Sequence, residues 1–128
     1  MKRRALVCED DPSIRSLVRT VMTREGFAVD LAADGREALE RLEEDCYDVL
    51  LVDLMMPNVD GYAVIRELRD RRPAMLKRVI VMTAASTALR EEFPENICTL
   101  LPKPFDIDRL KQIVRDCLET AEETNEER

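Results

Sequence analysis

The chain has 128 residues, a length that favours one domain burying roughly two-thirds of its unfolded surface in a single core. Its 27 acidic and 20 basic residues give a net charge of −7, which argues against direct binding of nucleic acid. No apolar stretch approaches the roughly 18 residues needed to span a bilayer, which argues against membrane insertion.

The first half of the chain predicts two strand–helix units. Residues 5–8 form a continuous apolar run, typical of a strand covered on both faces, and Asp11 with Pro12 begins the helix that follows. Residues 27–32 predict an edge strand, because a polar aspartate interrupts their apolar pattern. Asp34 starts an approximate capping box for a second helix.

The second half predicts three more strands and three more helices. The strands are indicated by apolar runs at residues 49–52, 79–82 and 97–101. The pair Asp60-Gly61 begins the third helix, and Asp106 caps the fifth. Residues 86–93 predict a short fourth helix that Pro94 ends.

The alternation of five strands and five helices predicts one doubly wound α/β domain. From residue 119 onward the chain is acidic and has almost no apolar residues. We therefore expect the domain to span residues 1–118 and residues 119–128 to form a disordered acidic tail.

Histidine is absent, and the four cysteines are widely spaced without a C-x-x-C pair. The missing histidines exclude histidine metal ligands, histidine-activated nucleophiles and phosphohistidine within this chain. The N-terminus lacks the apolar core of a signal peptide, so we expect reduced thiols in a cytoplasmic protein.

Residues suited to phosphoryl chemistry follow four of the predicted strands. Glu9-Asp10-Asp11 follow the first strand, Asp53 the third, Thr83 the fourth and Pro102-Lys103-Pro104 the fifth. The carboxyl ends of parallel strands lie along one edge, where open sheets bind ligands, so we expect these side chains to converge. Each residue alone has an ordinary structural explanation, such as a helix cap or a turn. Their joint placement is what indicates a site.

The residue types favour a metal-assisted phosphoryl transfer. Clustered carboxylates repel one another and favour a hard divalent cation such as Mg²⁺. A carboxylate beside the metal can attack phosphorus and form an aspartyl phosphate. The transferring group spreads negative charge over its equatorial oxygens, which Lys103 and Thr83 would contact from different sides. No general base is needed, which suits a chain without histidine.

Four stretches of the sequence carry a resemblance to a known family. They are Val7-Cys8-Glu9-Asp10-Asp11, Asp53-Leu54-Met55-Met56-Pro57-Asn58-Val59-Asp60-Gly61, Thr83-Ala84 and Lys103-Pro104-Phe105. In their order and spacing, over about residues 4 to 118, the chain resembles the receiver domain of two-component response regulators. This resemblance implies a flavodoxin-like (βα)5 fold whose five-stranded parallel sheet has the order 2-1-3-4-5.

The resemblance also implies roles for the acidic residues. Asp53 would be the phosphoacceptor. Asp11 would bind Mg²⁺ directly with the help of Asp10, and the backbone carbonyl of Met55 would complete the protein ligands.

At the other strands, the resemblance implies that Thr83 contacts the phosphoryl oxygen and moves on activation. Lys103 would pair with the phosphate, and the peptide bond from Lys103 to Pro104 would be cis. The family usually has an aromatic ring where this chain has Leu100. We therefore expect the switch through Thr83 to work by loop ordering, without an aromatic side chain.

By the same resemblance, the phosphoryl group would come from a phosphohistidine of a sensor histidine kinase or a His-phosphotransfer protein. The domain would catalyse its own phosphorylation and dephosphorylation, without being an enzyme for another substrate. Phosphorylation would change its affinity for a downstream protein target. We expect a monomer or weak dimer that is either a stand-alone regulator or a piece of a longer one cut at an acidic linker.

Two other functions stay open. An aspartyl-phosphate phosphatase would share the nucleophile and the metal, but such enzymes typically carry an acid/base aspartate where this chain has Met55. A phosphorylation-independent interaction module that keeps the fold is favoured by Leu100 and the reduced fourth helix, whereas the complete set of site residues argues against it. Nucleotide binding has no support, because the three glycines form no phosphate-binding pattern.

Overall fold

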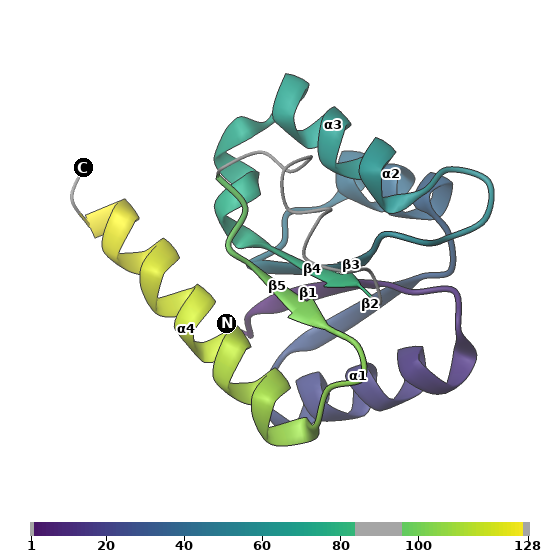
Figure 1. Ribbon diagram of the computed structural model, residues 1–128. Helices are drawn as coiled ribbons and strands as arrows, with labels where there is room; N and C mark the ends of the chain where they lie inside the picture. The colour runs from purple at the N-terminus through teal and green to yellow at the C-terminus, as the bar shows by residue number, and fades with distance from the viewer. Residues whose placement is uncertain (1, 84–95, 127–128) are drawn as a thin grey trace.

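A computed structural model describes residues 2–83 and 96–126 of the protein. In it, a central sheet lies between two layers of helices (Figure 1). The five described strands are parallel and lie in the order β2-β1-β3-β4-β5, which confirms the predicted fold. The strands are β1 (Arg4–Cys8), β2 (Ala28–Ala32), β3 (Val49–Asp53), β4 (Val79–Thr83) and β5 (Thr99–Pro102).

Helices cover both faces of this sheet: α1 and α4 lie on one face, and α2 and α3 lie on the other (Figure 1). Their bounds are α1 (Pro12–Arg24), α2 (Gly35–Glu44), α3 (Gly61–Arg71), the 3-10 helix η1 (Pro73–Arg78) and α4 (Ile107–Glu126). Among the residues that the structure describes, no helix combines the length and the apolarity needed to cross a membrane.

Two hydrophobic layers hold the helices to the sheet. The strands β3 and β4 are buried along their whole length, whereas β2 at the edge is partly exposed. Leu51 and Met82 belong to the layer under α1 and α4, and their neighbours Leu50 and Val81 belong to the layer under α2 and α3. Successive residues of one strand thus enter opposite layers, which explains why these strands are continuously apolar.

Aspartates cap the described α-helices, as the sequence predicted. The capping bonds run to Asp11 from Ser13 N (2.8 Å), to Asp34 from Glu37 N (2.9 Å), to Asp60 from Ala63 N (3.0 Å) and to Asp106 from Arg109 N (2.7 Å). Each cap fixes the point where a loop from the carboxyl edge of the sheet enters its helix. The loops that surround this edge are therefore anchored at their helical ends.

Two elements differ from the sequence prediction. The 3-10 helix η1 was not predicted; it begins at Pro73, whose fixed φ suits a first helical position. The backbone of α4 continues to Glu126, past the expected end of regular structure at Leu118. Glutamate and alanine are good helix formers, and they can extend a helix whose packed half is already formed. The predicted short helix at residues 86–93 lies outside the described residues.

The loop after β3 is tied to the start of α2 by close contacts. The Gly35 N–H donates to the Val59 carbonyl at 2.8 Å, and Asn58 Nδ2 donates to Asp34 Oδ2 at 2.8 Å. Asn58 has a φ of 63°, in the left-handed region that asparagine tolerates better than most residues. A single aspartate therefore caps α2 with one oxygen and holds the loop with the other.

We predict that Gly61→Ala disturbs the base of this loop. A Cβ atom at Gly61 would lie 2.3 Å from the backbone oxygen of Asp53 and 2.8 Å from the Cα of Leu54, so the main chain must shift to admit it. Such overpacking should lower the free energy of unfolding by about 2 kcal/mol. Urea denaturation measures this cost beside Arg66→Ala, a matched change at an exposed position of α3. Equal denaturation midpoints for the two variants would contradict the prediction.

Candidate functional site

The carboxyl ends of four strands meet at one edge of the sheet, as the sequence predicted. Glu9 directly follows β1, Asp53 ends β3, Thr83 ends β4, and Lys103 directly follows β5. The strand register keeps these ends level, since Asp53 pairs with Met82, one residue before Thr83. Residues from distant parts of the sequence are therefore brought to one place by the topology of the sheet.

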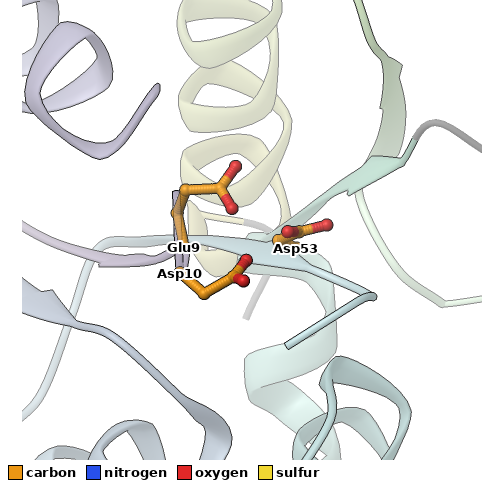
Figure 2. A group of neighbouring side chains, drawn as sticks. All are labelled: Glu9, Asp10 and Asp53. Atoms are coloured by element: carbon orange, nitrogen blue, oxygen red, sulfur yellow. The ribbon is translucent and has the colours of Figure 1, made fainter. Parts of the chain in front are cut away.

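Three carboxylates gather at the ends of β1 and β3, those of Glu9, Asp10 and Asp53 (Figure 2). One oxygen from each lies within 4.8 Å of those from the other two. Glu9 and Asp53 are buried, with 0% and 4% of their surface exposed, while Asp10 is exposed to solvent. The cluster thus has two buried members and one that a solvent ion can reach directly.

The ammonium group of Lys103 faces both buried carboxylates. Lys103 Nζ lies 2.5 Å from Glu9 Oε1 and 3.3 Å from Asp53 Oδ2. The Lys103 N–H donates to the Thr83 carbonyl at 2.8 Å, and the peptide bond to Pro104 is cis, as the resemblance implied. Burial acts to lower the pKa of Lys103, but the contacts with Glu9 and Asp53 outweigh it and raise the pKa. Lys103 is therefore a fixed positive charge of the site.

Both oxygens of Asp53 have partners. Asp53 Oδ1 accepts a hydrogen bond from the Met55 backbone N–H at 3.2 Å, and Oδ2 faces the Lys103 ammonium. The Met55 side chain itself is 73% exposed and extends away from the core. The main chain of the loop after β3 and the lysine after β5 together fix the orientation of the Asp53 carboxylate.

The cluster carries more negative charge than Lys103 neutralises. Burial and the hydrogen bond with Asp53 raise the pKa of Glu9 to about 7, and the contact with Lys103 opposes this only in part. A divalent cation would reduce the repulsion among the three carboxylates, and carboxylate oxygens are the donors that Mg²⁺ prefers. The residues present therefore fit a hard divalent cation held by Glu9, Asp10 and Asp53.

The structure places the acidic residues after β1 differently from the sequence analysis. Asp10 joins the cluster as expected, but Asp11 lies outside it, because Asp11 Oδ1 accepts hydrogen bonds from the N–H groups of Ser13 and Ile14 at 2.8 and 3.1 Å. Glu9, which the sequence analysis placed among the converging side chains without giving it a ligand role, occupies the cluster instead. The signal was present in the sequence, since the carboxylate before Pro12 was already identified as a helix cap.

Thr83 and Leu100 lie on the two neighbouring strands at the far side of the site. Thr83 is 5% exposed at the end of β4. Leu100 pairs with Val81 in the register of β4 and β5, and it packs against the hydrophobic layer under α2 and α3. Among the described residues, the aliphatic Leu100 thus packs here in place of the aromatic ring that is usual in the resembled family.

Curated relatives with similar sequences are longer proteins. Response regulator MprA of Mycolicibacterium vanbaalenii is 35% identical over 125 residues, which cover 92% of this chain and 51% of MprA. DNA-binding transcriptional regulator NtrC of Klebsiella pneumoniae is 33% identical over 97% of this chain and 26% of NtrC. The chain therefore spans about half the length of MprA and about a quarter of NtrC.

Solved receiver domains share the fold over nearly their whole length. The receiver domain of Francisella response regulator 1452 is 32% identical, with a TM-score of 0.83 over 92% of this chain and 98% of that one. TrrA from Thermotoga maritima, solved in complex with Mg²⁺-BeF, is 31% identical, with a TM-score of 0.80 over 91% of this chain and 99% of that one. The family model of the response regulator receiver domain matches residues 5–115 of this chain. Because this match runs from β1 into α4 and includes every described strand, the chain belongs to the response regulator receiver domain family.

Proposed function

We propose that this receiver domain is a phosphoacceptor of a two-component system or phosphorelay. Asp53 would accept a phosphoryl group from a phosphohistidine on a sensor histidine kinase or a His-phosphotransfer protein. The observation that carries the proposal is the position of the buried Asp53 carboxylate, 3.3 Å from the Lys103 ammonium and beside the carboxylates of Glu9 and Asp10. This combination supplies a nucleophile, a cation and ligands for a metal at one point.

The transfer needs only groups that lie at this edge of the sheet. An oxygen of Asp53 would form the new P–O bond while the P–N bond to the donor imidazole breaks, and the imidazole would leave with the bonding electron pair. Lys103 would neutralise charge on the oxygens of the transferring group. The Met55 N–H holds the Asp53 carboxylate in a fixed orientation, which reduces the ordering required before reaction.

We propose that Glu9, Asp10, Asp53 and the backbone carbonyl of Met55 hold Mg²⁺. When bound, Mg²⁺ would neutralise the carboxylates and polarise a phosphoryl oxygen. The close approach of the three carboxylates supports this set. In this proposal Asp11, to which the resemblance gave a ligand role, is replaced by Glu9, because the Asp11 carboxylate accepts hydrogen bonds from the first turn of α1.

We propose that Thr83 contacts the phosphoryl group and that its movement reaches a protein target through loop ordering together with the aliphatic contacts of Leu100, without an aromatic side chain. A tenfold change in affinity for such a target corresponds to about 1.4 kcal/mol, so a modest rearrangement of these contacts is sufficient. Residues 1–118 are the proposed extent of the domain. Leu118 is buried against the sheet layer, whereas the two residues after it are exposed.

Treatment with acetyl phosphate and Mg²⁺ should add one phosphoryl group to the protein, measured by intact mass. Asp53→Asn should abolish the addition because an amide lacks the nucleophilic carboxylate, and omission of Mg²⁺ should also prevent it. Addition of the same group to Asp53→Asn would place the phosphoacceptor elsewhere. No addition to the unmodified chain would favour an interaction module that works without phosphorylation.

Glu9→Gln and Asp10→Asn should each weaken Mg²⁺ binding by about tenfold or more, because each removes a negative ligand from the cluster. Asp11→Asn is the matched control: asparagine also caps helices, so Mg²⁺ binding should stay nearly unchanged. Isothermal titration with MgCl₂ measures all three affinities at one pH. Loss of affinity in Asp11→Asn with retention in Glu9→Gln would restore the assignment made from the resemblance.

Phosphorylation should also change the amide NMR signals of residues 99–101 in β5, because Lys103 lies just beyond this strand and Leu100 packs beside β4. Asp53→Asn under the same conditions is the control for effects of acetyl phosphate and Mg²⁺ alone. Signal changes restricted to the neighbours of Asp53 would show that phosphorylation does not reach Leu100.

A further inference from the structure

Cys98 and Cys117 lie together on the side of the sheet covered by α4, away from the carboxylate cluster. Cys98 directly precedes β5, and its backbone N–H donates to the Val79 carbonyl at the start of β4 at 2.9 Å. Cys117 lies on α4, and its thiol donates to the Lys77 carbonyl, just before β4, at 3.5 Å. The two cysteines are therefore held next to the same short piece of chain by separate hydrogen bonds.

The two side chains are in contact with each other. Each thiol is within hydrogen-bonding reach of the other, and Cys98 packs against the hydrophobic layer that contains Cys117. Cys117 is 1% exposed, whereas Cys98 is only partly buried. A small solvent-borne reagent can thus reach Cys98, and Cys117 lies immediately behind it.

The same contact divides reactivity between the thiols. The neighbouring Cys117 thiol lowers the pKa of Cys98, although burial and the charge of Asp116 act in the opposite direction. The pKa of Cys117 is raised, first by its contact with Cys98 and then by burial. Cys98 is the more exposed of the two thiols and the one whose pKa is lowered, so it is the one that attacks an oxidant first as a thiolate.

We propose that Cys98 and Cys117 are an oxidative modification site at which a peroxide closes an intramolecular disulfide. The Cys98 thiolate would attack one peroxide oxygen, breaking the O–O bond and giving a sulfenic acid and hydroxide. The Cys117 sulfur would then attack the Cys98 sulfur and displace the sulfenic oxygen as water. In sum, two thiols and one hydrogen peroxide give one disulfide and two waters, with two electrons passing from sulfur to oxygen.

The disulfide would join the start of β5 to α4. This link closes a loop of the chain from Cys98 to Cys117 and restricts the unfolded state, so the oxidised protein should unfold at a higher temperature than the reduced protein. None of the proposed phosphoryl-transfer residues takes part. Disulfide formation therefore does not depend on phosphorylation of Asp53.

The test uses the full chain with Cys46→Ser, because Cys46 is an exposed free thiol that would otherwise react between molecules. The protein is treated with hydrogen peroxide, then unfolded in N-ethylmaleimide, and its intact mass is measured. We expect a mass loss of two hydrogens, one alkylated cysteine (Cys8), and full alkylation after reduction. Peptide mapping should show Cys98 linked to Cys117, and Cys98→Ser should abolish the protection of Cys117.

Three results would overturn the proposal. Stable oxygen addition at Cys98 with Cys117 still alkylated would show that the second step does not occur. A disulfide that joins two molecules would show that the pair does not close internally. Protection that persists in Cys98→Ser would assign the chemistry to other thiols. If Cys117→Ser fails to fold, the Cys98→Ser variant and the peptide map still decide the question.

Discussion

The ion pairs of Lys103 are the interaction on which the site depends. Two buried carboxylates, from Glu9 at the end of β1 and Asp53 at the end of β3, lie 2.5 and 3.3 Å from one ammonium group that follows β5. Removing one partner of a buried ion pair leaves a charge uncompensated, at a cost of several kcal/mol. The Lys103 ammonium therefore helps to hold the ends of β1, β3 and β5 in register. The charged groups of the functional edge stabilise the sheet order, and the sheet order brings these groups together.

The same charge balance connects the structure to the proposed chemistry. One lysine does not neutralise three carboxylates, and burial together with the neighbouring Asp53 raises the pKa of Glu9 in spite of the Lys103 ammonium. A divalent cation would restore the balance in the free protein. A phosphoryl group on Asp53 would change it again, because it would offer Lys103 a more strongly charged partner than Glu9. In this account the signal begins as a redistribution of charge around Lys103 and spreads to Thr83, whose carbonyl accepts the backbone N–H of that lysine.

Sequence patterns predicted the strands of the sheet and most of the site residues, because short local stretches of sequence mark both. Strands buried on both faces are continuous apolar runs, and the first polar residue after each run marks the functional edge. Assigning a metal-ligand role to Glu9 or to Asp11 was harder. Acidic residues so close in sequence differ only in where their side chains point. The assignment is decided by the first turn of α1, which takes the Asp11 carboxylate as its cap. The helix beyond Leu118 was missed because the sequence after that residue is acidic and has almost no apolar residues, so no hydrophobic periodicity marks it. The contact between Cys98 and Cys117 depends on how α4 packs across the sheet, which no local pattern encodes.

The most direct test of the account is a crystal structure of the full chain with Mg²⁺ and beryllofluoride, a stable mimic of a phosphoryl group. We expect beryllium bonded to an oxygen of Asp53, with the Lys103 ammonium in contact with a fluorine atom. We also expect Mg²⁺ within reach of Glu9 and Asp10, while Asp11 still caps α1. Beryllofluoride on another residue, or Mg²⁺ bound by Asp11 with Glu9 and Asp10 turned away, would contradict it.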